Sequence, residues 1–127
     1  HTYNILDPLI GGIVTRYLRA NDIEIIYANE IDRNIIDSEA KRISKSVHWT
    51  MNKELLGAFS YYKDKVDGTI LISAFPCGPD SLTNEMILRK KENSKVLLLT
   101  FEEVNSDIAI ITRLESFVDM LKGGIHL

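Results

Sequence analysis

The sequence predicts an α/β fold, a three-layer domain in which helices cover both faces of a mostly parallel, four-stranded sheet of the Rossmann or flavodoxin type. Two observations support this class. Short apolar runs of strand length alternate along the chain with longer amphipathic stretches of helical periodicity. The apolar runs are nearly continuous, as in parallel strands that are covered on both faces. Right-handed crossovers between such strands place the helices on the two faces of the sheet.

Four segments have the composition of strands. Residues 69–75 and 96–101 are the strongest candidates, because both are rich in Ile, Leu and Val. Residues 23–28 form an apolar run interrupted by Glu24, and residues 1–6 read as the tail of a strand. If the first two crossovers run in opposite directions, the strand order is 2-1-3-4, counted along the chain.

Helices are expected between and after these strands. Asp7 is a suitable N-cap, with Pro8 at the first helical position. The last helix ends at the Gly123–Gly124 pair, and its apolar residues recur at helical spacing. Two helices share the second crossover, which elaborates the simple βαβ unit. The expected helices cover residues 8–20, 30–47, 51–65, 80–92 and 106–122.

Length and composition indicate a single α/β domain over residues 1–127, and 45% of the residues are apolar. The net charge of −3, and a densest basic cluster of only three residues at 89–91, speak against nucleic acid as a partner. No apolar run approaches the roughly 20 residues of a membrane span, and one cysteine allows no internal disulfide, so a cytoplasmic setting is expected. The absence of an initial methionine suggests a fragment of a much larger protein.

Cys77, the only cysteine, lies where a predicted strand breaks and a predicted helix begins. Three interpretations remain open from the residues alone. Cys77 is a small core residue, a nucleophile, or a ligand of a metal or an iron–sulfur cluster. The third interpretation is chemically attractive because a helix N-terminus stabilises a thiolate. No histidine base is identifiable for the second, and for the third a cluster takes about four cysteines, so the others would come from outside this chain.

The carboxyl ends of parallel strands meet at one edge of a sheet, and the crevice at its switch point is a common ligand site. Here that crevice is predicted between the strand ends that carry Asp7 and Cys77, with Glu102 facing it. Solvated loop carboxylate is the alternative for Glu102. Glycine-rich phosphate loops, nucleophile elbows and spaced histidine ligands are all missing from the sequence.

Several segments resemble a known family. They are YNILDP at residues 3–8, FPCGPDSL at 75–82, LLLT at 97–100 and TRLESFVD at 112–119, with Trp49 preceding a helix. Together they resemble a domain of the CoA-substrate-specific enzyme activases, which is similar to the subunits of 2-hydroxyacyl-CoA dehydratases such as 2-hydroxyglutaryl-CoA dehydratase. The likeness spans nearly the whole chain.

The resemblance implies a 4Fe-4S cluster held by cysteines scattered through a longer protein, with Cys77 as the matching ligand. The backbone amides of Asp80 and Ser81 would stabilise the anionic cluster, although both residues are also ordinary N-caps. The whole protein would use ATP-driven electron transfer and take an acyl-CoA and an electron donor as partners beside the rest of its own polypeptide, and no membrane is expected. The alternative is a non-enzymatic ligand-binding or docking module with a structural cysteine.

Overall fold

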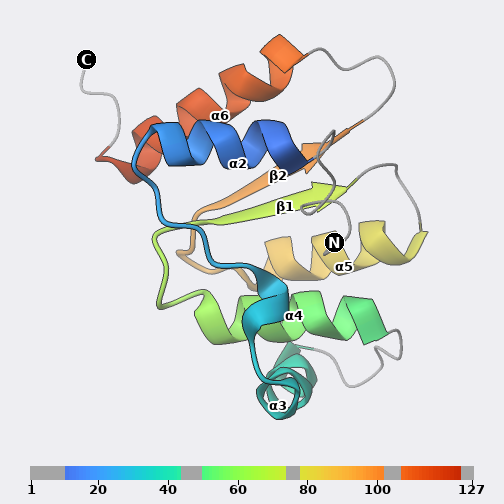
Figure 1. Ribbon diagram of the computed structural model, residues 1–127. Helices are drawn as coiled ribbons and strands as arrows, with labels where there is room; N and C mark the ends of the chain where they lie inside the picture. Colours follow the sequence, from blue (N-terminus) through green and yellow to red (C-terminus); the bar gives the residue numbers. More distant parts are fainter. Residues whose placement is uncertain (1–10, 44–49, 74–77, 102–106, 124–127) are drawn as a thin grey trace.

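The computed structural model describes residues 11–43, 50–73, 78–101 and 107–123. Five α-helices, one 3-10 helix and two strands occupy these ranges. In Figure 1, α2 and α6 lie on one side of the strands, α4 and α5 lie on the other, and α3 packs beyond α4. The elements are α2 (Gly11–Ala20), η1 (Ala28–Glu30), α3 (Arg33–Ile43), α4 (Thr50–Tyr62), β1 (Thr69–Ser73), α5 (Gly78–Lys90), β2 (Val96–Thr100) and α6 (Asp107–Leu121).

The sheet contains one parallel pair of strands within the described residues. β1 and β2 align with Thr69 opposite Val96 and Ser73 opposite Thr100. The predicted four-stranded Rossmann-like sheet is therefore wrong, since the described part of the chain is mostly helical and its sheet has two strands. The predicted first strand, residues 1–6, lies outside the described residues.

Residues 23–28 are predicted to be a strand, but residues 23–27 pair with no strand in the described part of the chain, and Ala28 begins η1. Ile23 and Ile25 pack their side chains against the cluster between α2 and α6, while Ile26 stays 46% exposed. The run thus buries apolar surface, and no described strand is hydrogen-bonded to it. It ends at η1, where the backbone N–H of Tyr27 donates to Glu30 Oε2 at 3.4 Å.

Two hydrophobic clusters flank the sheet, one on each face. Alternate residues of a strand point to opposite faces, so Ile70 and Ile72 join the cluster of α2 and α6, and Leu71 joins the cluster of α3, α4 and α5. The first cluster contains Val14, Leu18, Ile72, Leu99, Ile110, Leu114 and Val118. The second contains Ala40, Leu56, Phe59, Leu71 and Ile87.

Most helices lie close to their predicted positions, but one differs in its start. The predicted helix at residues 30–47 begins only at Arg33, because Asp32 acts as its N-cap: Asp32 Oδ1 accepts from the backbone N–H of Asn34 at 2.8 Å. Helix α2 ends in a turn in which Asp22 adopts a positive φ of 58°. Within the described ranges, no helix combines the length and the apolar character needed to cross a bilayer.

Candidate functional site

Two of the five predicted site residues, Asp80 and Ser81, lie in the part of the chain that the structure describes. Asp7, Cys77 and Glu102 lie outside the described residues, so the predicted crevice between the strand ends of Asp7 and Cys77 stays a prediction. Asp80 and Ser81 lie in the first turn of α5, and the structure describes their backbone but not their side chains.

The carboxyl end of β1 is tied to its neighbours by buried polar groups. Ser73, the last residue of β1, is 5% exposed, and its Oγ accepts a hydrogen bond from Asn84 Nδ2 of α5 at 2.9 Å. Its carbonyl oxygen accepts from the backbone N–H of Phe101 at 2.8 Å. The neighbouring Thr83 is buried as well. The first hydrogen bond joins β1 to α5, the two elements that precede and follow the segment containing Cys77, and the second joins β1 to the end of β2.

A metal cluster can be tested against the residues that are present. No group of three or more His, Cys, Asp or Glu side chains converges in the described ranges. The whole chain contains a single cysteine, whereas a 4Fe-4S cluster takes about four cysteine ligands. The chain therefore fits such a cluster only as the donor of one ligand.

A second candidate site runs along the edge of β1 that faces away from β2. One hollow of about 170 Å³ lies between β1, residues 23–29, and helices α2, α4 and α6. A second hollow of about 590 Å³ continues it past the beginning of β1 toward the end of α4. We call the two together the β1 groove. The lining residues that they share are Ile23, Glu24, Ile26, Ala28, Leu55, Gly68, Ile70 and Leu121.

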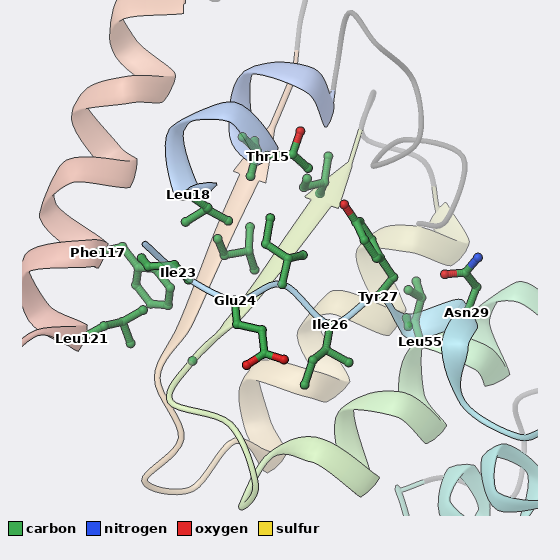
Figure 2. Close-up of a pocket in the computed structure, with 16 residues that line it drawn as sticks. Thr15, Leu18, Ile23, Glu24, Ile26, Tyr27, Asn29, Leu55, Phe117 and Leu121 are labelled. Atoms are coloured by element: carbon green, nitrogen blue, oxygen red, sulfur yellow. The ribbon is translucent and has the colours of Figure 1, made fainter. Parts of the chain in front are cut away.

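The walls of the β1 groove are apolar and its rim is polar. Figure 2 shows Leu18, Ile23, Phe117 and Leu121 gathered at one end, and Leu55 with Asn29 at the other. Glu24 lines both hollows and is exposed to solvent. Apolar walls with a few polar groups at the rim are the usual composition of ligand and peptide sites.

The backbone of β1 also contributes to the groove. Thr69 N–H donates to Lys95 O at 2.9 Å, and Ser73 O accepts from Phe101 N–H, so the peptide groups of alternate residues point to β2. Those of Ile70, between them, point to the groove. Among the described residues we find no hydrogen-bond partner for the backbone of Ile70.

Two side chains with displaced pKa values lie outside the lining of the groove. Burial raises the pKa of Tyr17, and the carboxylates of Glu115 and Asp119 raise it further. A hydrogen bond from Ser60 lowers the pKa of Glu39, and Arg42 lowers it further against the opposing effect of burial. Tyr17 of α2 interacts with carboxylates of α6, and Glu39 of α3 accepts a hydrogen bond from Ser60 of α4. The packing of helices therefore accounts for both pKa shifts.

The groove was not predicted from the sequence. Its residues come from five separate segments, and only Glu24, a charge within the apolar run at residues 23–28, marked one of them as unusual. An isolated charge of this kind fits an incompletely buried segment. Comparison with protein-family models, with curated proteins and with solved structures finds no match to this chain.

Proposed function

We propose that this chain is one domain of a larger iron–sulfur protein similar to the CoA-substrate-specific enzyme activases and the 2-hydroxyacyl-CoA dehydratases. In this proposal Cys77 donates one thiolate ligand to a 4Fe-4S cluster that serves ATP-driven electron transfer. The observation that carries it is the position of Cys77 in the chain, directly before Gly78, the first residue of the 13-residue helix α5. A helix N-terminus lowers the pKa of a nearby thiol and favours the thiolate, which is the form that binds metal.

The surroundings of this position support the proposal. The first amides of an α-helix have no partner within the helix, so the backbone N–H of Asp80, the third residue of α5, is available to an anionic cluster, and Ser81 follows it in the same turn. The hydrogen bond between Asn84 and Ser73 joins α5 to β1 and would hold the helix start in place. Asp7 and Glu102 are proposed to complete the polar edge.

The proposal assigns this chain a limited part of the chemistry. Since the chain has one cysteine, the other cluster ligands come from the rest of the parent polypeptide. Since the sequence has no phosphate-binding loop, ATP is bound elsewhere too. An electron donor and an acyl-CoA are the proposed partners of the whole protein, in a cytoplasmic setting.

The test is the iron and sulfide content of the longer parent protein after anaerobic reconstitution. Cys77→Ala is expected to lose the cluster and Cys77→Ser to weaken it, with circular dichroism unchanged in both. Ser94→Ala, a change in the loop after α5, serves as the matched control and should keep the full iron content. Equal iron in the wild type and in Cys77→Ala would refute the proposal.

A second candidate function is favoured by the β1 groove, which needs no cofactor. On this alternative the chain is a non-enzymatic docking or ligand-binding module, and Cys77 is a structural residue. A variant of the groove that loses ligand binding but keeps the iron content of the wild type would separate this function from the first. A Cys77 variant that loses iron but keeps ligand binding would separate them equally well. Neither proposal involves nucleic acid or a membrane surface.

A further inference from the structure

We draw no further inference here: the strongest candidate, the β1 groove between β1, residues 23–29 and helices α2, α4 and α6, is an apolar hollow whose rim carries charges of both signs, and nothing in the structure shows what covers it.

Discussion

Gly57 of α4 lies directly against the backbone of Ile36 in α3. A Cβ atom at Gly57 would stand 2.5 Å from the carbonyl oxygen of Ile36 and 2.8 Å from its Cα. Real Cβ atoms do not approach other heavy atoms so closely, so the two helices can cross at this distance only because position 57 carries no side chain.

Gly57→Ala should therefore lower the free energy of unfolding by about 2 kcal/mol, since forced overpacking outweighs the better helix propensity of alanine. Urea denaturation gives the value. Gly12→Ala is the control, because a Cβ there would meet only the flexible guanidinium of Arg16, at 3.1 Å. That variant should be as stable as the wild type or more stable by up to about 1 kcal/mol. Equal stability of Gly57→Ala and the wild type would show that α3 and α4 separate without cost.

The contact between α3 and α4 should depend on pH. Ser60 Oγ donates to Glu39 Oε2 at 2.7 Å and is the main cause of the lowered pKa of Glu39. A carboxyl whose pKa is lower in the folded state adds stability above its unfolded pKa of about 4.3, and this contribution is lost as pH falls through the folded value.

Ser60→Ala should therefore reduce the unfolding free energy by about 1 kcal/mol at neutral pH, and by less in acid. Thermal unfolding across this pH range measures the difference. Ser116→Ala removes an exposed hydroxyl that donates to the carbonyl oxygen of Thr112 and not to a carboxylate, so its effect should not vary with pH. A Ser60→Ala effect of constant size would argue against the assignment.

Tyr17 should affect stability at the opposite end of the pH range. Burial raises its pKa, and so do Glu115 and Asp119 of α6. A raised folded pKa contributes stability below the unfolded value of about 10, and that contribution disappears as pH rises through the folded value. Tyr17→Phe should therefore flatten the alkaline loss of stability. Asp119→Asn should lower the pKa of Tyr17 only in part, since burial and Glu115 still raise it. Spectrophotometric titration of the tyrosine measures this pKa. An unchanged pKa, or one that returns fully to the ordinary value of a tyrosine, would contradict the order of causes.

The bond between Ser73 and Asn84 should stabilise the junction of β1 with α5. Ser73→Ala leaves the amide of Asn84 without its acceptor in a partly buried position, which should cost about 1–2 kcal/mol. Thr112→Ala, on the exposed face of α6, should stay within about 0.5 kcal/mol of the wild type. In a double-mutant cycle with Asn84→Ala, additive effects would mean that the two side chains do not interact in solution.

Local pattern predicted several elements well. The apolar runs at residues 69–75 and 96–101 contain β1 and β2, and the periodic apolar residues of 106–122 form α6. Spacing along one segment decides which of its faces is apolar, and that is enough to predict a strand or a helix. The resemblance to the activase family and the roles of Asp7, Cys77, Asp80, Ser81 and Glu102 stay predictions, because they concern partners and ligands that the described residues do not include.

By itself, the sequence determined where most helices and the paired strands lie, since their periodicity is local. Only the tertiary structure decided that residues 23–27 pair with neither described strand and that the edge of β1 borders a groove. Ile23 and Ile25 bury part of their side chains against the cluster of α2 and α6, and the residues of the run do not themselves determine whether they pack there or in a sheet. Pairing and hollows arise between segments distant in the chain, so they follow from packing and not from the pattern of any one segment.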